Sequence, residues 1–298
     1  MSQSTPVMSE AASALRHDDL YQLLRDKRID FAPGFAGHTV HFDLESLECL
    51  NTSEETHFWS AVKRCLALSL IRKYISKKDF DLLDVGCGNG SFLWSVENAF
   101  PEARVAGFDG YPEALLHCRL RTTKARLGLG DINSIGSAPA RPEYDVIAAL
   151  DVLEHLDQPR KVAEALSRFL KPGGILIVTV PAHQFLWSSR DVFLRHRKRY
   201  SKKELVTLLQ GFGLKILWSN YCFSSLFLPA IFFRKFLFRW KKMSGENMEK
   251  TELKKIPLLN DLLKFIGCAE VKLSQYMPLP FGTSVYCVAR KTDAAAIQ

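Results

Sequence analysis

The sequence lacks paired cysteines, a signal peptide and any long apolar run. Its seven cysteines are scattered, with no CxxC pair and no zinc-type spacing, so we expect reduced thiols rather than a disulfide or zinc framework. The uncharged part of the segment 221–242, residues 221–233, is too short to span a bilayer. Residues 1–14 have neither the basic start nor the apolar core of an export signal. These absences predict a cytoplasmic protein.

Acidic residues are scarce in the last third of the chain. Residues 190–298 hold 20 Lys and Arg against 8 Asp and Glu, a net charge of +12, whereas residues 1–189 hold 20 against 24, a net charge of −4. A basic back half favours an anionic partner, either nucleic acid or lipid headgroups. The chain also lacks internal repeats, and its 298 residues suffice for one large domain with an extra lobe or for two modest domains.

Short apolar runs alternate with helical patterns from residue 80 onward. The runs FDLLDV, ARVAGFD, ARLGLGD, YDVIAALDVL and GILIVTVP predict five strands, and LKILWSN and SVYCVARK predict two more. The segments SFLWSVENAF, PEALLHCRLR, RKVAEALSRFL and SKKELVTLLQGFG predict the helices between them. Two further helices are expected earlier, at 15–28 and from about Thr52, where Thr52 and Glu55 form a capping box. This order predicts an α/β fold with a parallel sheet covered on both faces.

The stretch LLDVGCGNG, residues 82–90, places a glycine turn directly after the first of these strands. Such a turn aims backbone N–H groups at a ligand beyond the carboxyl end of the strand. The G-x-G-x-x-G order typical of NAD-binding turns is absent, because Ser91 stands where the third glycine would be. Asp84, at the end of the strand, would repel a pyrophosphate and favour a cationic ligand. S-adenosylmethionine, which carries a sulfonium and an ammonium and no phosphate, is such a ligand.

Two further carboxylates follow at the expected strand ends. Asp109 ends the second strand about twenty residues past the glycines, where a carboxylate can accept both ribose hydroxyls. Asp131 ends the third strand, where it can meet an adenine amino group. Both positions favour an adenosine compound.

Five motifs in order, LLDVGCGNG, GFDGYPEAL, GDIN, YDVIAALDVLEHL and LKPGGILIVTVP, resemble those of class I S-adenosylmethionine-dependent methyltransferases over residues 80–182. The resemblance implies a Rossmann-like, doubly wound sheet of seven strands, mostly parallel with the last strand antiparallel. It implies S-adenosyl-L-methionine as the cofactor and methyl transfer as the activity. The cofactor-binding residues that it implies are Asp84, Gly86, Cys87, Gly88, Gly90, Asp109, Gly110, Asp131, Ile132 and Leu150. Cys87 is expected to pack beside the cofactor, because no base is placed to activate it as a nucleophile.

The chain is predicted to divide into four segments. A helical N-terminal extension with lid helices occupies 1–79, and the cofactor-binding core occupies 80–218. A hydrophobic and basic insertion at 219–283 separates the last two strands, and 284–298 supplies the last strand and a tail. In the extension, Trp59 is expected to pack in the core or to close over the cofactor.

Two histidines are candidate general bases, which a hydroxyl acceptor would need. The first choice is His155 in LDVLEHLDQP, after the fourth strand, where ubiquinone-biosynthesis O-methyltransferases carry a similar EH. Its alternative role is capping or packing of the following helix. The second is His183 in VPAHQFLW, with an ordinary loop histidine as the alternative. Asp151, Glu154 and His155 could together ligate a divalent cation, but a magnesium site needs more oxygen ligands, so we predict no metal site.

The loop SSRDVFLRHRKRY, residues 188–200, is similar to a variant of the H-x-x-RY loop of bacterial methyltransferases that act on lipids or glycans. The pattern falls on His196, Arg199 and Tyr200, which the resemblance implies as substrate-binding residues. A guanidinium group suits a phosphate or carboxylate on the substrate. A solvated charged loop is the alternative.

The insertion contains YCFSSLFLPAIFFRKFLFRWKK, residues 221–242, and LLNDLLKFI, residues 258–266. Aromatic and apolar residues mixed with Arg and Lys suit a helix lying in a membrane interface, so an anionic membrane surface is a candidate partner. A roof over the active site and a dimer interface are the alternatives, and the sequence gives no signal for the oligomeric state.

The leading hypothesis is a methyltransferase acting on a small lipid-like or lipid-linked acceptor at the cytoplasmic membrane face, with O-methylation favoured. The alternatives are an RNA methyltransferase and a non-catalytic cofactor-binding module. Nucleic acid is the less favoured partner for two reasons. The fourth-strand motif is LDVLEH and not an NPPY-like motif for methylation of base amines, and no separate RNA-binding module is visible.

Overall fold

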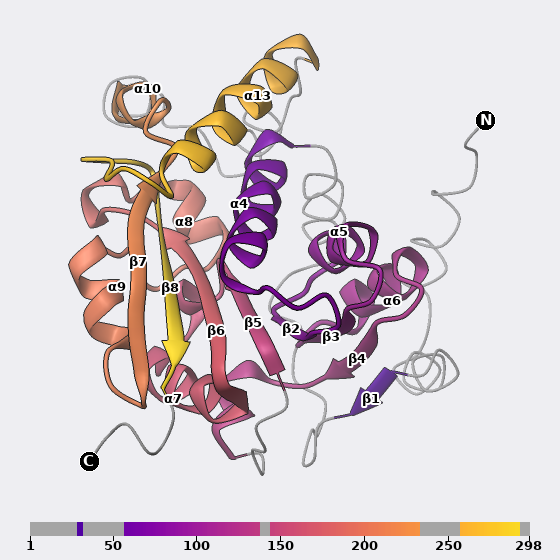
Figure 1. The fold of residues 1–298 in the computed structure, drawn as a ribbon. Coiled ribbons are helices and arrows are strands. Elements are labelled where there is room, and N and C mark those ends of the chain that lie inside the picture. The colour runs from indigo at the N-terminus through magenta and orange to yellow at the C-terminus, as the bar shows by residue number, and fades with distance from the viewer. Residues whose placement is uncertain (1–28, 32–56, 138–143, 233–256, 293–298) are drawn as a thin grey trace.

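The computed structural model describes residues 29–31, 57–137, 144–232 and 257–292 (Figure 1). The predicted helix at 15–28, the Thr52–Glu55 capping box and the basic stretch at 233–242 lie outside the described residues. No helix within the described ranges is long and apolar enough to cross a membrane.

Eight strands form one sheet in the order β1-β4-β3-β2-β5-β6-β8-β7 (Figure 1). Their bounds are β1 Ile29–Phe31, β2 Asp81–Val85, β3 Arg104–Asp109, β4 Arg126–Leu129, β5 Tyr144–Leu150, β6 Leu170–Pro181, β7 Leu214–Cys222 and β8 Ser284–Lys291. Strands β1 to β6 pair in parallel, whereas β8 is antiparallel to both β6 and β7. The predicted mostly parallel, doubly wound sheet with an antiparallel last strand is confirmed.

The sheet has one strand more than the seven predicted. The additional strand, β1, is three residues long and pairs with β4, where Ile29 lies opposite Leu127. Three residues are too few to give the alternating apolar pattern that identifies a strand, and β1 follows a segment with helical spacing. The sequence therefore carried no signal for it.

Helices cover both faces of the sheet, as predicted (Figure 1). One face carries α4 (Phe58–Tyr74), α5 (Ser91–Ala99), α6 (Pro112–Arg121) and α13 (Pro257–Leu273), and the other carries α7 (Pro159–Phe169) and α9 (Lys202–Leu209). The short elements are η1 (Ile132–Ser137), η2 (Leu153–His155), η3 (Gln184–Leu186), α8 (Ser189–Phe193) and α10 (Phe227–Phe232). Helix α7 buries Val162 and Leu166, one turn apart, against the sheet, and burying such a side chain contributes about 1.5–3 kcal/mol.

Helix α13 of the insertion packs along α4 of the N-terminal extension (Figure 1). Gly267 permits the close approach, since a Cβ atom there would lie 2.5 Å from Val62 Cγ2. The Phe58 backbone N–H donates to Asn260 Oδ1 over 2.8 Å, and Gln275 Nε2 donates to Ser69 Oγ over 2.6 Å. The two segments flanking the core in the sequence thus form one layer over the sheet.

The insertion differs from its predicted outline in two ways. Strand β7 continues to Cys222, and Tyr221, Cys222 and Phe223 are buried. The start of the predicted membrane-facing segment at 221–242 therefore belongs to the core, because the aromatic run continues the strand instead of starting a helix. The second difference is α13, which spans 17 residues where the LLNDLLKFI pattern predicted only a short helical stretch.

Candidate active site

The glycine turn after β2 has the backbone that only glycine adopts easily. Gly86, Gly88 and Gly90 have φ angles of 72°, 51° and 77°. A Cβ atom on Gly86 would lie 2.7 Å from Val152 Cγ2, and one on Gly90 would lie 2.5 Å from Cys118 Sγ. Both conformation and space therefore require glycine at Gly86 and Gly90, which bring the chain tightly from β2 into α5.

Asp109, at the end of β3, is bound to this turn. Its carboxylate accepts hydrogen bonds from the backbone N–H of Gly88 (2.8 Å) and of Tyr111 (2.9 Å). Burial raises the pKa of Asp109, and these backbone hydrogen bonds only partly offset the effect. Within the described ranges, no Lys or Arg side chain forms an ion pair with it. A buried carboxylate with backbone partners alone fits a ligand that offers hydroxyl donors or positive charge, and disfavours a pyrophosphate.

The other predicted cofactor-binding residues follow the same edge of the sheet. Because β2, β3, β4 and β5 are parallel, Asp84, Asp131 and Leu150 lie at or just beyond their carboxyl ends. Asp131 Oδ1 accepts the backbone N–H of Asn133 over 2.9 Å, which fixes the start of η1 at Ile132. The nearest atom to a Cβ on Gly110 would be a carbonyl oxygen 3.5 Å away, so this position is not tightly enclosed.

The Cys87 thiol is buried beside Cys118. A hydrogen bond with Cys118, together with burial, holds the pKa of Cys87 well above its ordinary value. The thiolate is the nucleophilic form of cysteine. At neutral pH Cys87 is therefore an unreactive thiol, which supports the predicted packing role.

Lys63 is a buried charge that sequence reasoning missed. It lies on α4 and forms an ion pair with Asp151, directly after β5. Burial lowers the pKa of Lys63 to about 8. Asp151 has a φ of 58° and accepts a hydrogen bond from Thr179 Oγ1 over 2.9 Å. One signal was present in the sequence, because Lys63 directly follows Val62 in the stripe of α4 that faces the core.

Two of the predicted substrate-binding residues are buried and have protein partners. Arg199 Nε donates to Asp191 Oδ1 over 2.7 Å, and Arg199 Nη1 donates to the Ala182 carbonyl over 3.1 Å. Tyr200 Oη donates to the Leu153 carbonyl over 3.2 Å. These contacts tie the loop after α8 to η2 and β6. Contact of Arg199 and Tyr200 with a substrate stays a prediction.

His196, the third of these residues, is held by a buried carboxylate. Its Nδ1 atom lies 2.9 Å from Asp191 Oδ1. Burial would raise the pKa of Asp191, but hydrogen bonds from His196 and Arg199 hold it well below its ordinary value. Asp191 is therefore ionised, and it fixes the orientation of the His196 ring.

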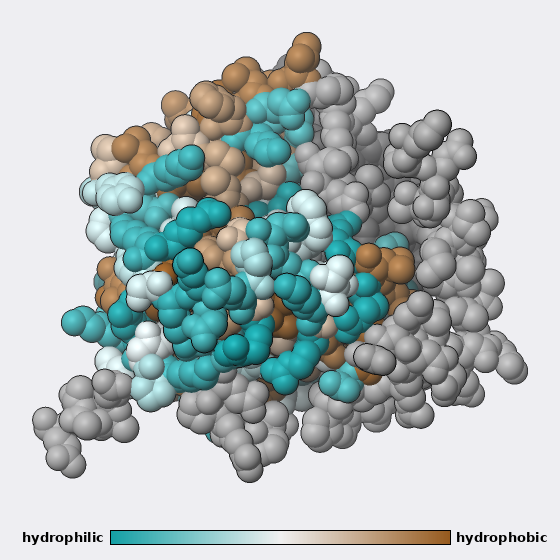
Figure 2. Space-filling view, turned by 45° about the vertical axis from the view of Figure 1, so that its right-hand side comes forward, coloured by the Kyte–Doolittle hydropathy of each residue, from teal (hydrophilic) through white to brown (hydrophobic). Residues whose placement is uncertain are grey.

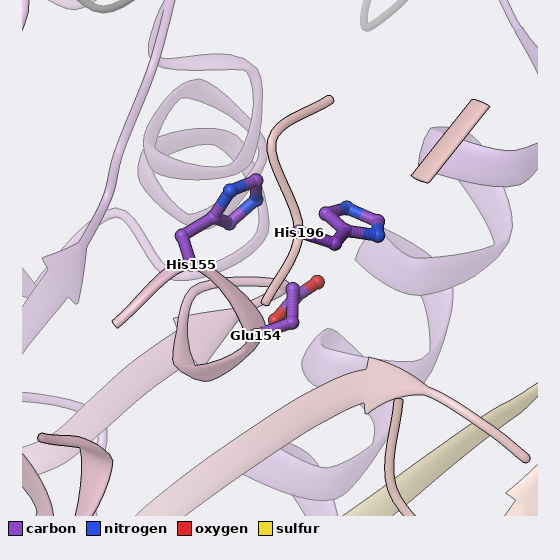
Figure 3. Close-up of side chains that lie close together, drawn as sticks. All are labelled: Glu154, His155 and His196. Atoms are coloured by element: carbon purple, nitrogen blue, oxygen red, sulfur yellow. The ribbon is translucent and has the colours of Figure 1, made fainter. Parts of the chain in front are cut away.

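Glu154, His155 and His196 lie together (Figure 3), with one ligand atom from each within 4.8 Å of the others. Glu154 is 1% exposed, and neither carboxylate oxygen has a hydrogen-bond partner. Burial raises the pKa of Glu154 to about 8 and lowers that of His155 to about 4. Asp151, which the sequence grouped with Glu154 and His155, pairs with Lys63 instead.

His183, the second predicted base, follows β6 in a strained conformation with a φ of 60°. Its ring stacks on Tyr221 with centroids 5.0 Å apart and lies 5.4 Å from the ring of Phe227. Its Nε2 atom is buried without a hydrogen-bond partner, and burial lowers the pKa of the ring. Trp59 on α4 stacks on Phe223 at 4.0 Å, as expected for core packing.

The profile of the methyltransferase domain family matches residues 58–218, which is more than half of the chain. The chain belongs to this methyltransferase family. Its cofactor is S-adenosylmethionine, as the glycine turn and its carboxylates predict.

Curated relatives of this methyltransferase include two O-methyltransferases. The ubiquinone biosynthesis O-methyltransferase of Serratia proteamaculans is 33% identical over 113 residues, covering 37% of this chain and 46% of that enzyme. The malonyl-[acyl-carrier protein] O-methyltransferase of Hahella chejuensis is 29% identical over 133 residues, covering 42% of this chain and 47% of that enzyme. The chain thus spans about half the length of these curated relatives.

Solved methyltransferases share the fold. The plantazolicin methyltransferase BamL, solved with a substrate analogue and SAH, superimposes with a TM-score of 0.56 at 13% identity, covering 85% of this chain and 92% of that one. At this identity, the similarity establishes the shared Rossmann-like fold.

Proposed function

We propose that this chain transfers the methyl group of S-adenosylmethionine to an oxygen of a small, lipid-like acceptor. The observation that carries the proposal is the arrangement along one sheet edge. The glycine turn with Asp109 lies beyond β2 and β3, and the His183 ring among aromatic side chains lies beyond β6. The names of the two curated relatives favour oxygen as the methylated atom.

The cofactor supplies an electrophilic methyl group when bound. Asp109 would accept the ribose hydroxyls, because it is buried and has only backbone partners. Asp84 and Asp131 would supply negative charge and an acceptor at the ends of β2 and β4. Gly86 and Gly90 would keep the turn beside the cofactor tight, because each packs where a Cβ atom has no room.

We favour His183 as the group that removes the acceptor proton. Its Nε2 is unpartnered, and its lowered pKa keeps the ring neutral and able to accept a proton at neutral pH. His155 faces His196, and burial lowers its pKa to about 4, so it is a weak base at neutral pH. A His183→Gln variant should lose at least about 100-fold in kcat while keeping cofactor affinity, since general bases contribute about 10²–10⁴-fold. A larger loss in His155→Gln would reverse this choice.

We also propose that α10 and α13 rest on an anionic membrane surface. Six side chains on these two helices are more than half exposed and form what we call the α10–α13 surface: Leu228, Phe232, Leu258, Leu262, Phe265 and Leu273. Figure 2 shows brown side chains gathered along the top of the molecule, where α13 lies. Exposed Lys264 and Lys272 stand on α13 beside them. Apolar side chains flanked by cations suit the headgroup boundary of a lipid layer.

Label transfer tests the proposed activity. The chain is incubated with methyl-labelled S-adenosylmethionine and a fractionated cell extract, and the label is followed into lipid, RNA, protein and soluble metabolites. We expect label in the lipid fraction, and less of it with Asp109→Asn at subsaturating cofactor. Label in RNA would favour an RNA methyltransferase, the alternative suggested by the basic residues of the back half. Tight cofactor binding without any labelled product would favour a non-catalytic module.

Vesicle sedimentation tests the membrane contact. The wild-type chain should bind vesicles containing phosphatidylglycerol, and Leu258→Ser with Phe265→Ser should reduce binding at least about tenfold, because each buried apolar side chain contributes about 1.5–3 kcal/mol. The matched control is Leu120→Ser on α6, which is equally apolar and 61% exposed. Equal binding of both variants would contradict the assignment.

A further inference from the structure

Glu154, His155 and His196 form a group that the methyl-transfer chemistry leaves unexplained. Glu154 and His155 come from η2, after β5, and His196 comes from the loop after α8. Figure 3 shows the three side chains lying close together on these two segments. Because 42 residues separate Glu154 from His196, only the tertiary fold brings the group together.

The spacing of the three ligand atoms suits a small cation. Three atoms that lie within 4.8 Å of one another share a point no farther than 4.8 Å/√3, about 2.8 Å, from each. Zinc binds imidazole nitrogen at about 2.0–2.1 Å and carboxylate oxygen at about 2.0–2.2 Å. Rotation of the side chains by less than about 1 Å would therefore complete the coordination.

The Glu154 carboxylate lacks the partner that such a cation would supply. It is almost fully buried, and both oxygens are without a hydrogen bond. The two basic side chains whose charges act on Glu154 have other partners, since Lys63 pairs with Asp151 and Arg199 pairs with Asp191. A buried carboxylate without a hydrogen bond or a bound cation is costly and uncommon in proteins.

The surroundings of His196 match those of a metal ligand. Asp191 binds Nδ1 over 2.9 Å and is itself held by Arg199. This leaves Nε2 as the ligating nitrogen in a ring whose orientation is fixed. A carboxylate that holds the second nitrogen of a histidine is the usual outer-shell arrangement of metal sites.

We infer that Glu154, His155 and His196 bind one divalent transition-metal ion, of which Zn²⁺ is the representative. Two imidazoles and one carboxylate select a metal of this kind over Mg²⁺ or Ca²⁺, which prefer all-oxygen sites. Three protein ligands leave coordination positions open. An oxygen of the acceptor could occupy one of them; this extension rests on the proposed function, whereas metal binding does not.

The experiment is a Zn²⁺ titration of the full, tag-free chain by calorimetry, after chelator treatment and removal of the chelator. Wild type should bind one Zn²⁺ per chain, and substitution with Co²⁺ should give the visible absorption of a nitrogen- and oxygen-ligated ion. Glu154→Gln and His196→Gln should each weaken Zn²⁺ binding at least about 100-fold, since loss of an outer-shell partner alone costs about 10–100-fold. The control is His117→Gln on α6, outside the group, which should bind as wild type does.

Thermal unfolding gives a second measurement in case one variant folds poorly. Zn²⁺ should raise the Tm of wild type and of His117→Gln, and leave the Tm of Glu154→Gln unchanged. The inference is overturned if wild type binds no stoichiometric Zn²⁺, or if both cluster variants bind it as tightly as wild type. Label transfer without Zn²⁺ binding would refute this site alone, and Zn²⁺ binding without label transfer would refute the proposed function alone.

Discussion

The two halves of the sheet edge stabilise their charged groups in different ways. In the cofactor half, beyond β2 and β3, Asp109 is held by the backbone N–H groups of Gly88 and Tyr111. In the other half, beyond β5 and β6, where we propose that the acceptor binds (the acceptor half), charges are held by other charged side chains. Lys63 pairs with Asp151 88 residues away, and Asp191 holds both His196 and Arg199 from the same loop region. The cofactor half is therefore built from turn geometry, and the acceptor half from pairing between charged side chains.

Because of this difference, we expect the two halves to tolerate different substitutions. A turn fixed by glycine conformation and close packing should be sensitive to a single added methyl group. A network of buried charges should be sensitive to the loss of one partner and tolerant of the loss of both. Of the three substitutions that follow, in order of decreasing expected effect, the first two test that contrast, and the third tests a charge pair at the opposite edge of the sheet.

Gly90→Ala should have the largest effect on stability. A Cβ atom would lie 2.5 Å from Cys118 Sγ at a φ of 77°, so the cost combines about 1–2 kcal/mol for the left-handed backbone with about 1–3 kcal/mol for overpacking. The control is Gly173→Ala, whose φ of 79° is similar but whose Cβ would meet nothing within 4 Å. In urea unfolding, the control should lose about 1 kcal/mol of unfolding free energy. Equal losses of unfolding free energy in Gly90→Ala and Gly173→Ala would mean that packing does not fix the turn.

Lys63→Met should cost about 2–3 kcal/mol, because it leaves Asp151 without its cation. This is less than for a fully buried pair, since the Asp151 side chain is 32% exposed. The double variant Lys63→Met with Asp151→Asn should recover most of the loss in urea unfolding. The control is Lys77→Met, which removes an exposed lysine from Asp145 and leaves that carboxylate paired with Lys171, so it should cost less than about 1 kcal/mol. A double variant as unstable as the sum of both single variants would show that the pair is not coupled.

Asp81→Asn should have the smallest effect and a defined pH dependence. Hydrogen bonds from Arg104 and then Lys171 lower the pKa of Asp81 to about 2. A carboxylate with a lowered pKa stabilises the fold above its unfolded pKa, near 4, and this stability is lost as the pH falls through 2. Because Arg104 is mostly exposed, we expect a loss of about 1 kcal/mol at pH 7. The difference between wild type and Asp81→Asn should shrink between pH 4 and pH 2, and a constant difference would contradict the account.

The sequence predicted the strand and turn geometry of the cofactor half, because its signals are local; contact of these residues with the cofactor stays a prediction. Glycines at Gly86, Gly88 and Gly90 and an acid at Asp109 need only a strand–turn–helix context, and the structure supplies it. The parallel order of the core strands followed from the alternation of strand and helix patterns. The extra strand β1 was missed because three residues carry no periodicity.

The sequence predicted the acceptor half less well, because its contacts are long-range. The pattern D-x-x-E-H grouped Asp151 with Glu154 and His155 by spacing alone. In the folded chain Asp151 pairs with Lys63, and His196 joins Glu154 and His155 instead. Spacing along a helix cannot reveal a partner from another segment of the chain. The one indication in the sequence was Lys63, a lysine among the apolar residues of α4.

The most direct test of the central claim is calorimetric titration of the chain with S-adenosylmethionine and, separately, with NADH. We expect one S-adenosylmethionine per chain, at least about tenfold weaker binding by Asp109→Asn, and no binding of NADH. Gly88 donates to Oδ2 and Tyr111 to Oδ1, so Asn keeps an acceptor for one of these two N–H groups, and circular dichroism checks that the variant is folded. Unchanged affinity in Asp109→Asn, or binding of NADH at the same site, would contradict the assignment of the carboxylate-flanked turn.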